Sequence, residues 1–288
     1  MTANRVTGRL VAALGFGLAL NGSTLADPIT SVAEPSCAAP MALSAIVAPL
    51  ERTASRIEAR KPLTILAMGS SSTVGVGATS PAMSYPSRLE RELSQRFPDG
   101  EIKVINHGVG GQDVPEELTR LERDVTAEHP DLVIWQVGTN AVLRRDDRSS
   151  DEQLIARGVA LLQQEGVDVV LMDLQYAPRV LARPAWTEME RLIKAIARHA
   201  HVGLFRRFEI MEAWDHTHQL APAEMIGADG LHMTDVSYGC LANQLADALA
   251  SNWRARGKLA ESPNRNPASI AQFDSSAGAR PSGMVGQR

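Results

Sequence analysis

The chain has few of the features that would indicate a membrane protein or a nucleic-acid-binding protein. After residue 26, no apolar run is long enough to cross a bilayer as a helix. The 29 basic side chains are outnumbered by 33 acidic ones and form no basic stripe, so we do not expect nucleic-acid binding. Aromatic residues make up only 4% of the chain, and most are expected in the core. Trp186 and Trp214 follow strand-like runs and are the candidates for lining a substrate rim.

Residues 1–26 have the pattern of a secretory signal peptide. Arg5 and Arg9 flank the start of an apolar stretch over residues 10–20, and Thr24-Leu25-Ala26 has the small residues of a cleavage site. The apolar stretch is too short to span a bilayer, although an uncleaved anchor is the alternative. The sequence therefore predicts an exported protein, periplasmic or secreted, with no stable membrane insertion.

Composition also sets the expected limits of the folded part. Residues 27–48 have the Pro/Ala content of a linker. Residues 257–288 are rich in Ser, Pro, Asn, Gly and Arg, and have too little apolar surface to pack a core, so a disordered tail is predicted. A single domain over residues 49–256 remains, which is a normal size for one hydrophobic core.

Strand-like and helix-like patterns alternate along this domain. Five near-continuous apolar runs are typical of parallel strands buried on both faces: Leu63–Met68, Ile102–Asn106, Leu132–Val137, Val167–Asp173 and Val202–Phe205. Helical patterns follow them: Ser84–Phe97, Pro115–Glu128, Asp151–Gln164, Ala185–Ala200 and Asp235–Arg254. This alternation predicts an α/β fold of three layers, α/β/α, around a five-stranded parallel sheet.

Polar turns follow the first three strands, at the sheet edge where ligands bind in such folds. The first turn carries three adjacent serines, Ser70, Ser71 and Ser72, any of which is a candidate nucleophile. A flexible Gly/Ser loop and a phosphate cradle are the alternatives. The turn lacks the lysine and the glycine spacing of a P-loop, and GxGxxG is absent as well.

A second polar turn, Asp229-Gly230-Leu231-His232, lies just before the last helix. A carboxylate three residues before a histidine can orient the imidazole as a base toward a serine. A surface loop is the alternative, and the remaining histidines considered are assigned to that class: His107, His199, His201, His216 and His218. No carboxylate or cysteine spacing completes a metal site around His216 and His218, so no metal is expected.

Gly111 and Asn140 are the candidate oxyanion donors. Gly111 ends the turn after the second strand, where a backbone N–H without a side chain can approach a substrate oxygen. Asn140 follows the third strand and can offer its side-chain amide. Glycine and asparagine are also common turn residues, so each assignment depends on the serine and histidine being present together.

These residues resemble the SGNH/GDSL hydrolase family, whose name refers to a Ser, Gly, Asn and His in four separate blocks. The blocks match, in order, Gly69-Ser70-Ser71-Ser72-Thr73-Val74-Gly75, Asn106 with Gly111, Gly138-Thr139-Asn140, and Asp229 with His232. The register of the first block selects Ser71 as the nucleophile. The resemblance covers roughly residues 63–249.

The resemblance implies a flavodoxin-like sheet, a shallow open site, and neither a metal nor an organic cofactor. Ser71 N–H, Gly111 N–H and the Asn140 amide would form the oxyanion hole. Ser70 and Ser72 stand where the family motif has Asp and Leu, and Ala141 stands where an Asp often follows. These departures prevent a subfamily, and hence a substrate, from being assigned by the motif.

The sequence therefore predicts an exported serine esterase that acts through Ser71, His232 and Asp229. A small-molecule or carbohydrate ester, short-acyl or O-acetyl, is the expected substrate. Two alternatives use the same fold: a carbohydrate O-acyltransferase with the same triad, and a non-catalytic carbohydrate-binding protein. A complete set of Ser71, Asp229 and His232 argues against the second.

The chain has only two cysteines, Cys37 and Cys240. Export would place both in an oxidising compartment, where an even pair tends to form a disulfide. We expect a Cys37–Cys240 bond that fixes the N-terminal linker to the last helix. The alternative is two unrelated thiols, one of them a small apolar side chain within a helix.

Overall fold

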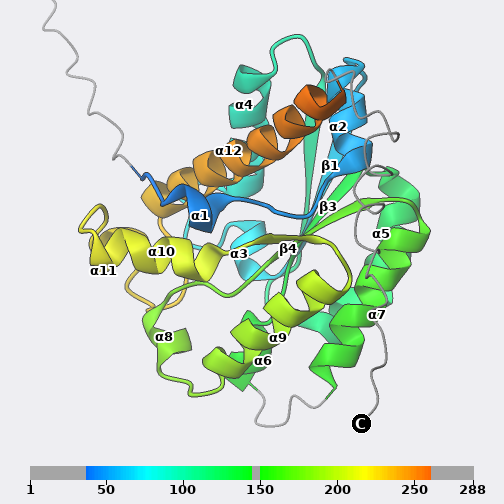
Figure 1. The fold of residues 1–288 in the computed structure, drawn as a ribbon. Helices are drawn as coiled ribbons and strands as arrows, with labels where there is room; N and C mark the ends of the chain where they lie inside the picture. The colour runs from blue at the N-terminus through cyan, green and yellow to red at the C-terminus, as the bar shows by residue number, and fades with distance from the viewer. Residues whose placement is uncertain (1–36, 145–149, 261–288) are drawn as a thin grey trace, which may run out of the picture. The chain divides into compact units, whose positions relative to one another are not determined.

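The computed structural model describes residues 37–144 and 150–260, and these contain a single five-stranded sheet (Figure 1). The strands are β1 Leu63–Gly69, β2 Ile102–Gly108, β3 Leu132–Gln136, β4 Asp168–Met172 and β5 Gly203–Phe205. All are parallel, in the order β2-β1-β3-β4-β5. This is the flavodoxin-like strand order. The predicted fold class is confirmed.

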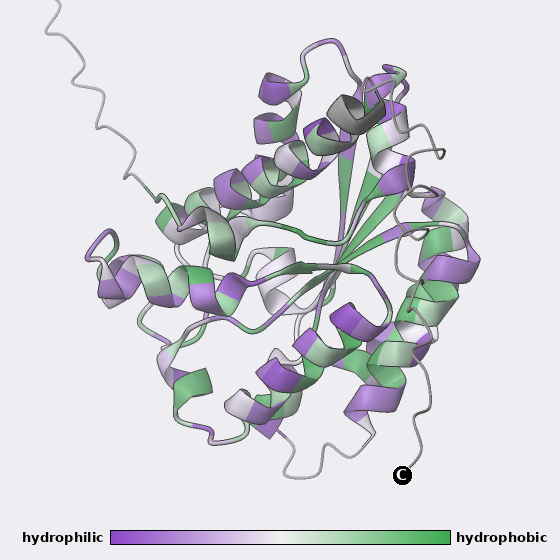
Figure 2. Cartoon of the chain, viewed as in Figure 1, coloured by the Kyte–Doolittle hydropathy of each residue, from purple (hydrophilic) through white to green (hydrophobic). Residues whose placement is uncertain are grey.

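The central strands are apolar because helices cover both of their faces. Every residue of β3 is buried, and so are all but one of the residues of β1. The edge strand β2 is buried only at Ile102. Figure 2 shows the same distribution, with hydrophobic colours along the strands and mixed colours on the covering helices.

The main helices form two layers. α2 Glu51–Glu58, α4 Tyr85–Arg96 and α12 Asp235–Ala260 pack together on one side of the sheet, and α5 Val114–Glu128, α7 Asp151–Gln164 and α9 Trp186–His199 on the other (Figure 1). All except α2 were expected from the sequence, and α7 has the expected bounds. α12 continues to Ala260, past the expected domain limit at Arg256.

The remaining helices are shorter than these or lie in connections. They are α1 Met41–Ser44, α3 Ser71–Val74, η1 Pro81–Met83, α6 Thr139–Arg144, α8 Pro178–Leu181, α10 Arg207–His216 and α11 Pro222–Met225. α3 and α6 begin directly after β1 and β3, at the carboxyl edge of the sheet. They therefore place the polar turns of the sequence where ligands are expected to bind.

Residues 37–48 pack against the domain, so the linker expected over residues 27–48 is wrong for this part. Ile46 is buried, and the Asn252 amide donates to the carbonyls of Ile46 and Ala48 at 2.8 and 2.9 Å. The Pro/Ala composition of the segment does not indicate that Ile46 is buried in the domain. The predicted signal peptide, residues 27–36 and the tail beyond residue 260 lie outside the described residues.

A disulfide joins the start of this segment to α12. Cys37 and Cys240 are bonded, with Cα atoms 5.4 Å apart. The Trp214 indole also donates to the carbonyl of Cys37 at 3.0 Å. Among the residues described, no helix has the length and apolar character needed to cross a membrane.

Candidate active site

Ser71 lies at the carboxyl end of β1, where the chain turns directly from strand into helix. β1 ends at Gly69, and Ser71 is the first residue of α3. Gly69 has a φ of +153°, and a Cβ there would meet the Gln136 side chain at 2.9 Å. A glycine is therefore needed just before the serine turn. The hydroxyl of Ser71 is presented at the sheet edge by this tight connection.

His232 and Asp229 reach Ser71 from the loop between α11 and α12. The Nε2 atom of His232 is 3.0 Å from Ser71 Oγ, and its Nδ1 atom is hydrogen-bonded to Asp229 Oδ2. The other carboxylate oxygen, Asp229 Oδ1, accepts from the backbone N–H groups of Leu231 and His232 at 2.9 and 3.0 Å. The structure thus brings together the three residues that the sequence assigned to nucleophile, base and orienter.

The environment of Asp229 keeps its carboxylate charged. Burial alone would raise its pKa, but the two backbone donors and the His232 side chain outweigh that effect and lower the pKa to about 2. The carboxylate is 46% exposed at its side chain, so solvent also supports the charge. An ionised Asp229 accepts a hydrogen bond from the Nδ1–H of His232, which leaves Nε2 as the acceptor toward Ser71.

Gly111 and Asn140 lie on neighbouring turns that are bonded to each other. Asn140 is the second residue of α6, and its amide donates to the carbonyl of Gln112 at 2.7 Å. An asparagine amide has two N–H groups, so one remains for another acceptor. Gly111 has a φ of +82°, and a Cβ there would be 3.1 Å from the Arg144 guanidinium. The oxyanion role of Gly111 and Asn140 stays a prediction.

Asn106, which matched the second family block, connects the Gly111 turn to the nucleophile helix. Its amide donates to the carbonyl of Thr73 at 2.8 Å, and its oxygen accepts from Gly108 N–H at 2.9 Å. A Cβ at Gly108 would collide with the backbone of α3, so the two turns are in close contact. The role of Asn106 is structural in this arrangement.

Several buried polar residues around these turns were not predicted from the sequence. Gln136 accepts from both the N–H and the hydroxyl of Ser70 at 3.0 Å. Arg120 donates to the Gln112 side chain at 2.7 Å and to the carbonyl of Gly69 at 3.3 Å. Gln175 contacts Ser72. Gln136 and Gln175 lie at the carboxyl ends of strands, which is the same signal that identified Ser71 and Asn140.

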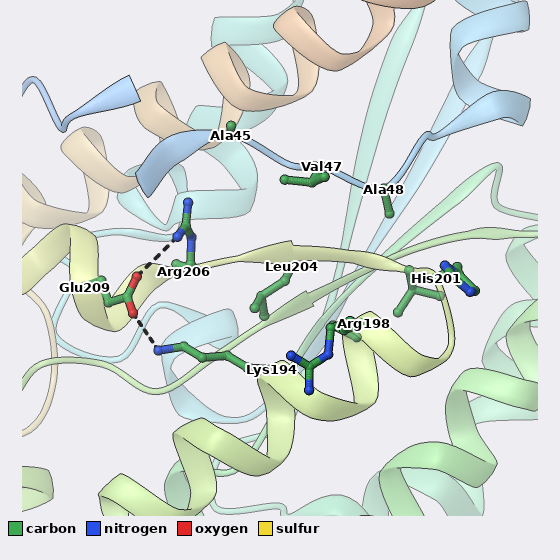
Figure 3. Close-up of a pocket in the computed structure, with 11 residues that line it drawn as sticks. Ala45, Val47, Ala48, Lys194, Arg198, His201, Leu204, Arg206 and Glu209 are labelled. Carbon is green, nitrogen blue, oxygen red and sulfur yellow. Dashed lines mark hydrogen bonds and ion pairs between the residues drawn. The ribbon is translucent and has the colours of Figure 1, made fainter. Parts of the chain in front are cut away.

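A separate groove lies at the edge strand β5 (Figure 3). It has a volume of about 410 Å³ and runs between residues 45–48 and α9. On its rim, Glu209 is bonded to Lys194 at 2.5 Å and to Arg206 at 3.5 Å. The groove has no serine or cysteine nucleophile among its lining residues, so the chemistry is assigned to the Ser71 site. No group of three or more His, Cys, Asp or Glu side chains within residues 37–144 and 150–260 is arranged to hold a metal.

Comparison with known families decides the classification. The sequence pattern of the non-GDSL lipase-like family matches residues 36–255. The chain belongs to this family. The expected relationship to SGNH/GDSL hydrolases is confirmed, and Ser70 and Ser72, in place of the Asp and Leu of the GDSL motif, accord with the family's description. The match begins at residue 36, so the family also includes the segment that precedes α2.

Individual relatives agree with this classification. An arylesterase of Vibrio mimicus is 26% identical over 170 residues, which is 59% of this chain and 80% of the relative. An acetylxylan esterase of Geobacillus stearothermophilus superposes with a TM-score of 0.54 at 22% identity, covering 66% of this chain and 95% of its own. A two-domain esterase active on acetylated mannans gives a TM-score of 0.58 at 19% identity, covering 73% of this chain. This chain spans only 55% of that esterase.

Proposed function

We propose that the protein is an exported serine esterase that removes short acyl groups, O-acetyl groups on carbohydrate above all, through an acyl-enzyme. The chain is a carboxylic ester hydrolase, as its family and its arylesterase relative indicate. The observation that carries the proposal is the 3.0 Å contact between Ser71 Oγ and His232 Nε2, with Asp229 on Nδ1. Export is inferred from the signal-peptide pattern of residues 1–26.

The mechanism follows from the positions of these groups. Ser71 Oγ attacks the acyl carbon while His232 Nε2 takes its proton, and Asp229 stabilises the resulting imidazolium. The N–H groups of Ser71 and Gly111 and the Asn140 amide hold the oxyanion. His232 then gives its proton to the leaving alcohol. A water molecule, deprotonated in turn by His232, releases the acid and restores Ser71.

The carbohydrate part of the proposal is supported by the solved structures of the same fold that act on acetylated xylan and mannan. Their low identity makes them evidence for the fold, so the substrate class needs its own test. The two candidate rim tryptophans do not form an open platform. Trp214 is fully buried, and Trp186 stacks on Phe208 with ring centroids 4.6 Å apart. Recognition of a sugar would therefore depend on other groups.

The experiment uses the mature protein purified after export and its Ser71→Ala variant. We expect hydrolysis of nitrophenyl acetate and release of acetate from acetylated xylan or mannan by the wild type only. A fluorophosphonate probe should label Ser71. No labelling and no hydrolysis would contradict the esterase proposal and favour a non-catalytic carbohydrate-binding protein. Acetate transfer to an added sugar in place of release would instead identify an O-acyltransferase.

A further inference from the structure

A buried glutamine connects the nucleophile helix to the loop that carries the base. Gln175 follows β4 and is 1% exposed. Its Oε1 atom is 2.6 Å from Ser72 Oγ, and its Nε2 atom is 2.7 Å from the carbonyl oxygen of Leu231. Ser72 is the neighbour of Ser71, and Leu231 is the neighbour of His232. One side chain therefore bridges the residues beside the two reacting groups.

Chemistry fixes the direction of this bridge. The carbonyl of Leu231 can only accept a hydrogen bond, so the amide nitrogen of Gln175 must face it. The amide oxygen then faces Ser72, whose hydroxyl donates. Ser72 is also 1% exposed, so water does not compete for these groups. Loss of either bond would leave a buried polar atom without a partner.

The segment that carries Gln175 is itself held in place by buried charged groups. Arg207 donates to the carbonyls of Asp173 and Leu174 at 2.6 and 3.2 Å. Glu190 accepts from Leu174 N–H at 3.2 Å, and Asp173 accepts from Phe208 N–H at 2.9 Å. The backbone on the N-terminal side of Gln175 is therefore fixed to α9 and α10. The Gln175 side chain therefore extends from a backbone segment that is held by several hydrogen bonds.

Other links between the two catalytic segments are farther from the reacting atoms. The Tyr238 hydroxyl donates to the carbonyl of Val76 at 2.8 Å, and Asp235 accepts from Thr79 N–H at 2.9 Å. These bonds join the end of the nucleophile turn to the beginning of α12. Apart from the Ser71–His232 contact itself, the bridge through Gln175 is the hydrogen-bonded side-chain link that reaches the immediate neighbours of both residues in the described structure.

We propose that Gln175 is a positioning residue that sets the distance between Ser71 and His232 by holding Ser72 and the Leu231 carbonyl at once. The inference rests on the proposed function, because it assigns a reaction role to those two residues. Ser71 and His232 are 161 residues apart in sequence, so their alignment depends on contacts of this kind. A displacement of about 1 Å between reacting groups can reduce a rate by about 10²-fold.

The test compares Gln175→Leu with the wild type in kcat, KM and the rate of fluorophosphonate labelling. We expect kcat and the labelling rate to fall about 10- to 100-fold with KM little changed, because the change affects Ser71–His232 alignment and not substrate binding. Gln163→Leu is the matched control. It removes a glutamine bond to the Ala200 carbonyl of 2.8 Å, far from the site, and should leave kcat unchanged.

Two milder variants keep the test decisive if Gln175→Leu folds poorly. Ser72→Ala removes only the first bond and should lower kcat less than Gln175→Leu, and the double variant should be no worse than Gln175→Leu alone. Gln175→Glu retains the shape, but a carboxylate cannot donate to Leu231. Its kcat relative to wild type should rise as the pH falls, because a protonated carboxyl restores the donor.

The outcomes separate this inference from the proposed function. Wild-type hydrolysis that is lost in Ser71→Ala establishes the esterase independently of Gln175. With that result in hand, a folded Gln175→Leu variant with wild-type kcat and labelling rate overturns the positioning role. The positioning role is also overturned if Ser72→Ala and Gln175→Leu lower kcat independently, so that their fold-changes multiply in the double variant. A Gln175→Glu variant whose kcat relative to wild type does not change with pH has the same meaning.

Discussion

At the scale of single residues, the three adjacent serines have three different environments. Ser71 faces His232, Ser70 is bonded to Gln136, and Ser72 is bonded to Gln175. The sequence alone left the choice among them open, and only the family register selected Ser71. The geometry gives a physical reason for that choice, since the bonded hydroxyls of Ser70 and Ser72 are directed elsewhere.

We predict that Ser71→Ala abolishes hydrolysis of a short-chain aryl ester, whereas Ser70→Ala retains most of the activity and Ser72→Ala a measurable part of it. Ser72→Ala should be the less active of these two, because it also removes the hydrogen bond to Gln175. Initial rates with nitrophenyl acetate measure the effect. Activity that survives in Ser71→Ala but disappears in Ser70→Ala would show that the register is wrong.

The oxyanion assignment makes a prediction for Asn140. As a proposed oxyanion donor, its amide would act mainly in the transition state, so Asn140→Ala should lower kcat by about 10²–10³-fold with little change in KM. Because the same amide donates to Gln112, part of the loss reflects a looser Gly111 turn. Steady-state kinetics distinguish the cases: an increase in KM alone would make Asn140 a substrate-binding residue.

At the scale of secondary structure, apolar runs were reliable signals and buried polar residues were not. The five strands followed from their Val, Ile and Leu content, because parallel strands covered on both faces are mainly apolar. α2 was missed because only Thr53 and Ala54 of its eight residues are buried. α10 begins with a fully buried arginine, Arg207, which composition would place in solvent. The burial of Gln175 could not be predicted from the sequence either, since its hydrogen-bond partners come from other elements.

Asp173, which directly follows β4, and Glu190, in α9, form a buried acid pair. Burial raises the pKa of Asp173 well above its usual range, and the Glu190 charge raises it further. Burial also raises the pKa of Glu190, against the opposing effect of Lys194, 3.5 Å away. Neither Asp173 Oδ2 nor Glu190 Oε2 has a hydrogen-bond partner among the described atoms. A proton kept between the two carboxyl groups would give both oxygens a partner.

This pair predicts a pH-dependent stability. The folded state keeps a proton that the unfolded chain releases above about pH 4, so this contribution is complete below that pH and is lost as pH rises toward the folded-state pKa. The loss is about 1.4 kcal/mol per pH unit for one proton. Asp173→Asn supplies a permanent donor to Glu190, so its stability should depend less on pH. Urea unfolding at pH 5 and pH 7.5 measures both slopes, and equal slopes would contradict the shared proton.

At the scale of the whole domain, the site is assembled from distant parts of the chain. Ser71, Gly111 and Asn140 were placed correctly at one sheet edge because the carboxyl ends of parallel strands lie together. The loop of His232 follows no strand, so this residue was identified instead by the carboxylate that lies three residues before it. The folded limit at Pro49 was wrong because residues 37–48 are held by Asn252 and Trp214, neither of which is near them in sequence.

We expect the Cys37–Cys240 bond to stabilise the folded domain. The bond closes a loop with a sequence separation of 203 residues, so chain entropy sets an upper limit of about 5 kcal/mol on its stabilisation. Cys240 lies in α12, eight residues after His232, so the bond also holds the N-terminal segment against the helix that follows the catalytic loop. Intact mass measurement of the protein purified without a reductant should show no free thiol. Cys37→Ala and Cys240→Ala should lower the unfolding midpoint by similar amounts, and a reductant should lower the wild type to match them. Two alkylatable thiols in the native protein purified without a reductant, or a reductant with no effect on the midpoint, would show that the cysteines act separately.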